Sequence, residues 1–167
     1  VDAAREKLVA IQDISALVRQ IEYRALDRRW IFFHPTLVWQ TAPVSSNNVL
    51  RSPRNRVLIS LGKNRSETTN GHWASATLAD KSVVSTRDNA SGFPLYLFDE
   101  DGELGFGGTS GRPNISAEFL CHLATRLGLP QQGEFHLPHG LTPEDIFHYA
   151  YAVLHSPGYR SRYAEHL

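Results

Sequence analysis

Residues 28–66 read RRWIFFHPTLVWQTAPVSSNNVLRSPRNRVLISLGKNRS. Aromatic and branched apolar runs at residues 30–33 and 56–61 are typical of strands, and the polar residues between Pro43 and Pro53 predict a loop. The same stretch carries seven Lys or Arg side chains and no Asp or Glu, whereas the rest of the chain carries ten basic and 17 acidic groups. The formal net charge of zero therefore conceals a basic segment within an acidic frame, which favours a polyanionic partner.

Length and composition indicate one globular domain, or one domain with an appended helical piece. The chain has 167 residues, of which 41% are hydrophobic, enough to build a core. Its single cysteine, Cys121, excludes an internal disulfide, and its apolar helical surroundings predict a buried, inert thiol. No apolar run is long enough for a membrane span and no signal-peptide pattern opens the chain, so we expect a cytoplasmic protein. The absence of methionine and the helical pattern at residues 165–167 suggest a piece of a longer polypeptide.

Short strands fill the middle of the predicted fold. The apolar spacing over residues 3–21 predicts one helix or two, because Asp13 and Ser15 are both good N-caps. Asn70-Gly71 predicts a hairpin turn. We expect strands at residues 23–33, 37–39, 56–61, 81–86 and 93–98.

Helices are predicted after residue 113. Ser116 caps a helix that runs to Leu127, with Gly128 as its stop, and residues 130–140 form a loop. Thr142-Pro143-Glu144-Asp145 is typical of a helix start, and Ser156-Pro157 begins a final helix. The prediction is an α+β fold in which a mixed central β-sheet has a flanking N-terminal helix and a C-terminal helical subdomain. Its parts are an N-terminal helical segment (1–22), a β-rich core (23–98), an acidic glycine-rich linker (99–113) and the helical subdomain (114–167).

No catalytic or metal-binding motif is visible in the sequence. His136 and His139, like His148 and His155, lack the cysteine pair or glutamate that accompanies zinc sites, which favours ordinary hydrogen-bonded histidines. The glycine run at residues 105–111 lacks the lysine of a phosphate-binding loop and favours a flexible linker. From the residues alone, the basic stretch is either a nucleic-acid surface or a solvated face paired with the acidic residues.

Three blocks of sequence resemble a known family. The first is Tyr23-Arg24-x-x-Asp27-x-Arg29-Trp30-Ile31, the second is Phe93-Pro94-Leu95-Tyr96-Leu97, and the third runs over residues 114–120 and 142–164. They are similar to the C-terminal part of single-chain Type ISP restriction-modification enzymes and related adenine-specific DNA methyltransferases. The third block is long and specific. The chain departs from the family at Ala25-Leu26, where Pro-Phe is usual, and in the loops around residues 44–56 and 63–73.

The resemblance implies a target-recognition (specificity) domain that binds double-stranded DNA and positions an upstream methyltransferase domain of the same polypeptide. The parent enzyme would use S-adenosylmethionine for N6-methylation of adenine, with or without a restriction nuclease. The methyltransferase motifs, a nuclease signature and a helicase P-loop are absent here, so no cofactor is expected on this chain. The alternative is a protein–protein coupling domain that docks onto the methyltransferase or translocase part. A hydrolase or nuclease is a further rival.

Candidate DNA contacts follow from charge and hydrogen-bonding capacity, because Arg and Lys neutralise phosphates while Arg and Asn also read base edges. Trp73 is a further candidate for packing on DNA. Trp30, Phe32, Trp39 and Tyr96 are assigned to the core, Arg24 and Asp27 to a structural role, and Tyr149, Tyr151, Tyr159 and Tyr163 to packing. The phosphate or base contacts are Arg28, Arg51, Arg54, Arg56, Lys63 and Arg65, and the expected base readers are Asn47, Asn48, Asn64, Arg87 and Asn89.

Overall fold

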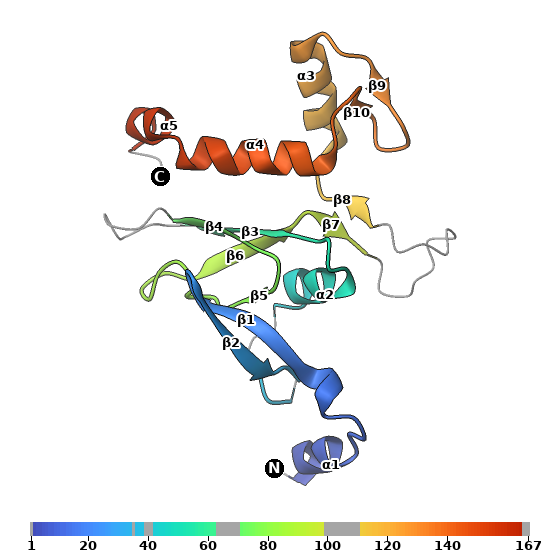
Figure 1. Cartoon of the computed structure of the whole chain (residues 1–167), viewed down its shortest axis with the longest axis vertical. Coiled ribbons are helices and arrows are strands. Elements are labelled where there is room, and N and C mark those ends of the chain that lie inside the picture. The colour runs from blue at the N-terminus through green and yellow to red at the C-terminus, as the bar shows by residue number, and fades with distance from the viewer. Residues whose placement is uncertain (1, 35, 39–41, 63–70, 99–110, 165–167) are drawn as a thin grey trace.

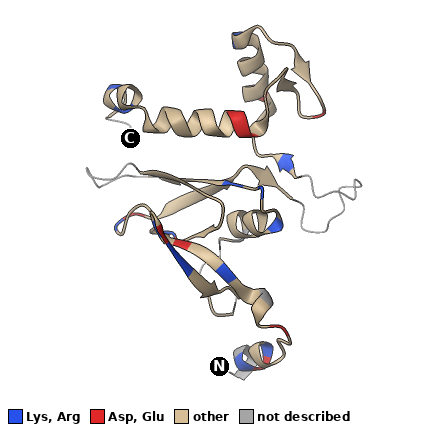
Figure 2. Ribbon diagram, in the orientation of Figure 1, with Lys and Arg blue, Asp and Glu red and all other residues tan. Residues whose placement is uncertain are grey.

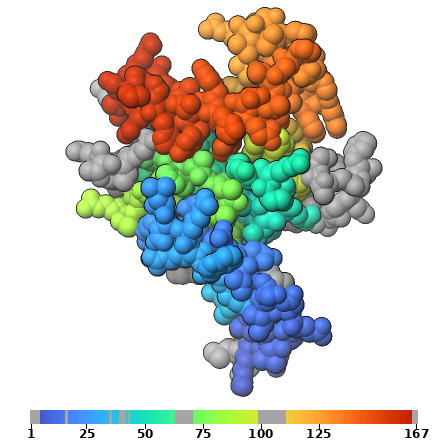
Figure 3. Space-filling model, in the orientation of Figure 1, coloured from blue at the N-terminus to red at the C-terminus, as the bar shows by residue number. Residues whose placement is uncertain are grey.

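The computed structural model describes residues 2–34, 36–38, 42–62, 71–98 and 111–164. Short strands form the middle of the molecule, with one helix at the N-terminal end and several beyond the strands at the C-terminal end (Figure 1). The space-filling view shows α1 (Asp2–Val9) as a protrusion at the end of the molecule away from the C-terminal helices (Figure 3). The α+β prediction is confirmed.

The first sheet is built on a hairpin of β1 (Val18–Arg24) and β2 (Asp27–Phe32), which pair antiparallel. The short strand β5 (Leu78–Ala79) adds parallel to β1, so the sheet is mixed. The predicted helix over residues 3–21 is wrong beyond α1. A 3-10 turn, η1 (Ser15–Leu17), follows, and β1 then begins at Val18. Pairing with β2 overrides the helical spacing because a hairpin satisfies the backbone of this branched and aromatic segment.

The second sheet has the order β4–β3–β6 and is antiparallel throughout. Its centre is β3 (Val57–Leu61), which confirms the predicted strand and buries alternate residues. Its neighbours are β4 (His72–Ser75) and β6 (Ala90–Pro94). The hairpin turn predicted at Asn70-Gly71 includes a residue outside the described part of the chain. The core cluster consists of Val49, Val57, Ile59 and Val83.

Two of the predicted strands are absent from the described residues. Residues 81–86 form turns, in which the Val83 N–H donates to Asp80 O and the Val83 carbonyl accepts from Ala25 N, each at 3.0 Å. The apolar side chain of Val83 therefore packs into the core from a loop and not from a strand. Residues 36–38 form a turn and a bend, and Trp39 lies outside the described residues.

The polar segment predicted as a loop forms helix α2 (Pro43–Arg51) instead. Pro43 lies in its first turn, where a missing N–H costs nothing, and Val49 packs into the core. The helix lies against β5 and β6. Gly92 of β6 permits this approach, because a Cβ there would lie 3.1 Å from Ser45 Cβ. Tertiary burial of one face therefore overrides the loop-like composition.

The predicted strand at residues 93–98 is interrupted at Leu95. Its first part is the end of β6, and its second part is β7 (Tyr96–Leu97), which pairs with β8 (Arg112–Pro113) in a separate small sheet. The Leu95 N–H donates to Arg56 O at 2.7 Å, which holds the break against the start of β3. Residues 99–110 of the predicted linker lie outside the described part.

All three C-terminal helices begin as predicted, and the first also ends as predicted. Helix α3 (Ala117–Leu127) is capped by Ser116 and ends at Gly128, whose φ is 65°. Helix α4 (Pro143–His155) begins with a capping box between Thr142 and Asp145, and α5 (Pro157–Arg162) follows. The loop predicted at residues 130–140 contains a small hairpin, formed by β9 (Gln131–Gln132) and β10 (Leu137–Pro138). Helix α4 packs against β4 and lies across the second sheet (Figure 1).

Three burial predictions are wrong. The Trp30 side chain, assigned to the core, is 70% exposed on β2, and Tyr149 is 71% exposed on α4. The Cys121 thiol is exposed. In each case the side chain points away from the neighbouring elements, although its sequence context is apolar. Among the described residues, no helix is both long and apolar enough to cross a membrane.

Candidate nucleic-acid interface

The arginines at the start of the basic stretch are paired with carboxylates. Arg28 Nε lies 2.7 Å from Oε1 of Glu22, which is only 2% exposed. Arg29 lies 2.8 Å from Asp27, and the hydrogen bond from Arg29 lowers the pKa of Asp27. Arg24 lies 3.3 Å from Asp80. Figure 2 shows basic and acidic residues side by side on the β1–β2 hairpin. The charge of this hairpin is therefore largely compensated, and Arg28 is held by a structural partner.

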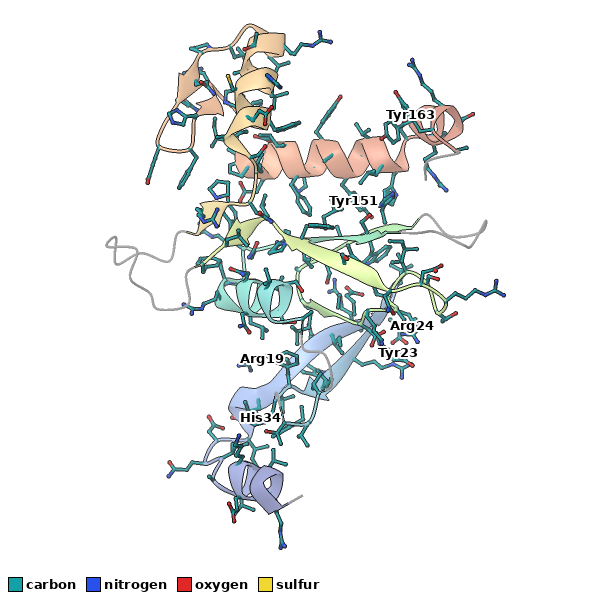
Figure 4. All side chains as sticks on the ribbon, turned by 180° about the vertical axis from the view of Figure 1, so that it is seen from behind. Arg19, Tyr23, Arg24, His34, Tyr151 and Tyr163 are labelled. Atoms are coloured by element: carbon teal, nitrogen blue, oxygen red, sulfur yellow. The ribbon has the colours of Figure 1, made fainter. Side chains whose placement is uncertain are left out.

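Tyr23 fixes two of these arginines further. The Arg24 and Arg29 guanidinium carbons lie 4.0 and 4.1 Å from the centroid of the Tyr23 ring. Figure 4 shows Tyr23 and Arg24 together at the end of the hairpin. These contacts agree with the structural role predicted for Arg24 and Asp27, with Asp80 and Arg29 as their respective partners.

The turn between α2 and β3 presents the next arginines. Arg51, in the last turn of α2, and Arg54 are exposed. Arg56 is half-buried, and its Nη1 donates to Pro53 O at 3.0 Å and to Asn55 O at 2.8 Å. Arg56 therefore braces the turn, while Arg51 and Arg54 extend from it.

Asn55 holds this turn rigid, although it is not among the candidates predicted from the sequence. Its exposed fraction is 0%, and its amide makes four hydrogen bonds. Nδ2 donates to Asn48 O (2.8 Å) and Tyr96 O (2.9 Å), while Oδ1 accepts from Arg56 N (2.9 Å) and Tyr96 N (3.0 Å). The signal that could have found it is an asparagine between a helix end and a strand start, where backbone groups need partners.

The two asparagines of α2 have different surroundings. Asn47 is exposed and stays a candidate base reader. Asn48 is buried, with Nδ2 donating to Val44 O at 2.6 Å and Oδ1 accepting from Phe98 N at 2.5 Å. The prediction that Asn48 reads a base has no support in this geometry, because both ends of its amide hold the domain together.

The remaining candidates lie in two further segments. Arg87 and Asn89 are exposed in the turn before β6, where Ser85 Oγ accepts from the backbone N–H of Arg87 at 3.2 Å. Trp73 of β4 is half-buried and packs against the core cluster, so it is not presented for contact with DNA. Lys63, Asn64 and Arg65 lie outside the described residues, and their assignment stays a prediction.

Nothing in the described part of the chain assembles a metal site. No group of three or more His, Cys, Asp or Glu side chains there is close enough to hold an ion. A cavity of about 180 Å³ lies between the two sheets and α2, and its walls are mainly apolar, including Ile21, Ile31, Val49 and Ile59. The cavity therefore continues the apolar packing between the sheets and α2.

His72, the first residue of β4, lies near the C-terminal helices. Its Nδ1 lies 3.1 Å from Ser60 Oγ. Burial lowers the pKa of His72, and electrostatic interactions with His155 and Arg160 lower it further. The end of α4 and the helix α5 therefore lie close enough to this strand to act on it electrostatically.

The family model of the Type ISP C-terminal specificity domain matches residues 2–167. The chain belongs to this family. The family suggested by the three sequence blocks is therefore confirmed. The match to the Type ISP specificity domain covers both main sheets and the C-terminal helices.

One solved structure supports the same fold. The chain aligns with a chain in the cryo-electron microscopy structure of a DrdV–DNA complex, with a TM-score of 0.67 and 23% sequence identity. The alignment covers 91% of this specificity domain and 13% of that chain. No curated protein matched the sequence. The domain thus corresponds in fold to a small part of a much longer polypeptide.

Proposed function

We propose that this chain recognises a specific sequence in double-stranded DNA and thereby positions an adenine-N6 methyltransferase of the same restriction-modification polypeptide. The observation that carries the proposal is membership of a specificity-domain family over residues 2–167. The solved relative of the same fold is described as a complex with DNA. The exposed pair Arg51 and Arg54, next to the exposed Asn47, supplies suitable chemistry.

The turn after α2 suits base or phosphate contact. Arginine binds guanine or phosphate with two parallel hydrogen bonds, and such pairs need a rigid mounting to discriminate between bases. Asn55 and Arg56 provide this mounting from inside the turn, leaving Arg51 and Arg54 outside. Arg87 and Asn89 form a second exposed candidate pair. Arg28 contributes less in this proposal because its charge is compensated by Glu22.

Methylation itself would take place elsewhere in the polypeptide. The chain corresponds to 13% of the solved chain that it matches, which leaves room for a methyltransferase domain. S-adenosylmethionine would bind to that domain, and the target adenine would be flipped out of the duplex into it. This chain would hold the duplex in register and carry no step of methyl transfer.

A gel-shift titration with duplexes of random and selected sequence tests the proposal. The chain should bind DNA at low salt, and log K should fall by about 0.9 for each phosphate neutralised per decade of salt. Arg54→Gln should relax the preference at one base pair by roughly 1–3 kcal/mol if Arg54 reads a base. Arg126→Gln, on an exposed arginine of α3, is the matched control. Absence of binding to any duplex at about 50 mM salt would overturn DNA recognition.

Trp30 favours a second candidate function, which is docking onto another part of the polypeptide. This side chain is 70% exposed on a hairpin in which Arg24, Arg28 and Arg29 are each paired with a carboxylate. An exposed tryptophan without excess charge is typical of a protein-binding surface. In the whole enzyme, Trp30→Ser should then lower methylation while the DNA affinity of the chain stays unchanged. Equal loss of both would assign Trp30 to DNA contact instead.

A further inference from the structure

Helix α5 carries positive charge with no carboxylate beside it in the described part of the chain. Residues 146–164 contain no Asp or Glu, and Glu165, the next residue, lies outside the described part. The nearest preceding acids are in the first turn of α4, a helix of 13 residues, so they lie about 20 Å from α5. Arg160 and Arg162 are both exposed in the last turn of α5. Figure 2 shows basic residues on α5 and acidic residues at the far end of α4.

The packing of α4 on β4 places α5, and with it Arg160 and Arg162, near the end of the second sheet. Tyr151 is on the side of α4 that faces the sheet (Figure 4), and its ring centroid lies 4.1 Å from that of His155. His155 of α4 and Arg160 of α5 both lie near enough to His72 of β4 to lower its pKa. The end of the second sheet, the end of α4 and α5 therefore lie close together, and Arg160 and Arg162 give this region its positive charge.

The arginines of α5 differ from three of the arginines of the β1–β2 hairpin. Arg24, Arg28 and Arg29 each pair with a carboxylate, whereas no ion pair joins the arginines of α5 to a carboxylate among the described residues. The Arg162 guanidinium lies 5.7 Å from the centroid of the Tyr163 ring, and that ring lies 4.7 Å from the ring of Tyr159. The tyrosines give the positive charge an aromatic support without neutralising it.

We propose that Arg160 and Arg162 form a second DNA-contacting surface, the α5 surface, which grips backbone phosphates outside the part of the target read by the domain. This inference rests on the proposed DNA recognition and adds residues that lie far in sequence from the basic stretch. Phosphate is the appropriate ligand because guanidinium groups bind it through parallel hydrogen bonds, and the described part of the region lacks carboxylates that would repel it. Such contacts position a duplex and carry no sequence information.

The test is the double substitution Arg160→Gln/Arg162→Gln in the whole chain, assayed by gel shift against random and selected duplexes. Affinity at about 0.1 M salt should fall roughly tenfold for each phosphate interaction removed, equally for all sequences, and the salt slope should decrease by about 0.9 per phosphate. Arg160→Lys/Arg162→Lys keeps the charge and should retain most of the slope. Circular dichroism and thermal unfolding of each variant check that the fold is intact.

The control is Arg5→Gln/Lys7→Gln, which removes two exposed charges from α1 at the opposite end of the molecule (Figure 1). This variant should keep the wild-type slope. If the wild-type chain binds DNA and the α5 variant binds with an unchanged slope, the α5 surface is wrong while DNA recognition stands. If the wild-type chain binds no duplex even at about 50 mM salt, both proposals fall together. A loss confined to one sequence would also overturn the α5 surface as a phosphate contact.

Discussion

Asn55 connects three elements through one buried side chain. Its amide bonds the end of α2, the start of β3 and both backbone groups of Tyr96 in β7. Asn55→Ala would leave several of these groups buried without partners, and each such group costs about 1–3 kcal/mol. We expect a loss of roughly 2–4 kcal/mol in the free energy of unfolding by urea denaturation. Asn47→Ala, an exposed change in α2, should cost far less, and equal effects would contradict the proposed role of Asn55.

His72 should make stability depend on pH. Its pKa is lowered in the folded state, chiefly by burial and then by electrostatic interactions with His155 and Arg160. The unfolded state therefore takes up this proton first as pH falls through about 6.5, and stability decreases until the folded pKa is also passed. His72→Gln should flatten the profile of unfolding free energy between about pH 8 and pH 5.5. His148→Gln, at an exposed position of α4, controls for general histidine effects, and identical profiles in the two variants would exclude His72 as the cause.

The sequence predicts the role of a residue where its partners are close in the chain. It does not predict the role where burial or a distant partner determines what the side chain contacts. Asn47 and Asn48 are neighbours of one residue type, yet the helix turns one outward and the other inward. Arg28 looked like a phosphate contact because its partner Glu22 lies outside the acid-free stretch and meets it only through hairpin pairing. Trp30 looked like core because tryptophan is usually buried, and its exposure depends on which face of the hairpin is covered.

At the scale of elements, one polar contact ties α4 to the sheets. The Tyr96 hydroxyl of β7 donates to Glu144 Oε1 at 2.8 Å, and burial together with Glu144 raises the pKa of Tyr96, so the hydroxyl stays a donor. Tyr96→Phe should destabilise the chain by about 1 kcal/mol, toward the lower end for a charged acceptor because both groups are only partly buried. Urea denaturation measures the change. Glu144→Gln keeps an acceptor and should cost less, so a larger loss in that variant would contradict the assignment.

Elements with their own capping signals were predicted well. Helices α3 and α4 begin at Ser116 and Thr142 because these caps satisfy the first N–H groups from within the local sequence. Helix α2 and strand β1 were missed because their conformations depend on distant partners. Gly92 and the core around Val49 make room for α2, and β2 and β5 pair with β1. The polar composition of residues 43–53 favoured a loop, and the apolar spacing of residues 3–21 favoured a helix.

For the whole molecule, the α+β class and the helical C-terminal end followed from the order of patterns along the sequence. The division of the strands into separate sheets did not, because the parallel pairing of β5 with β1 builds the first sheet and the break at Leu95 separates β7 from the second. The interface changes accordingly. The basic stretch predicted as the interface runs from Arg28 to residue 66. In the structure, the charge of Arg28 at its start is compensated by Glu22, and a second group of exposed arginines lies on α5, about 100 residues further along the chain.

Two positive regions on one molecule allow a prediction about how DNA is held. Arg51 and Arg54 follow α2, whereas Arg160 and Arg162 lie on α5 beyond the other end of the second sheet (Figure 1). If one duplex contacts both regions at once, their phosphate contacts are independent, and the free-energy losses of distant substitutions add. Arg51→Gln/Arg54→Gln and Arg160→Gln/Arg162→Gln should each lower the salt slope of binding, by about 0.9 per phosphate interaction removed.

The quadruple variant, measured on the same duplex, decides between simultaneous and alternative contact. Simultaneous contact predicts that its decrease in slope equals the sum of the decreases in the two double variants. Alternative contact predicts that either double variant keeps nearly the wild-type slope, because the duplex uses the region that remains, and that only the quadruple variant shows a lower slope. Only the first outcome fits a domain that holds its target in a fixed orientation, because a duplex that exchanges between two regions has no single register in which to present one adenine.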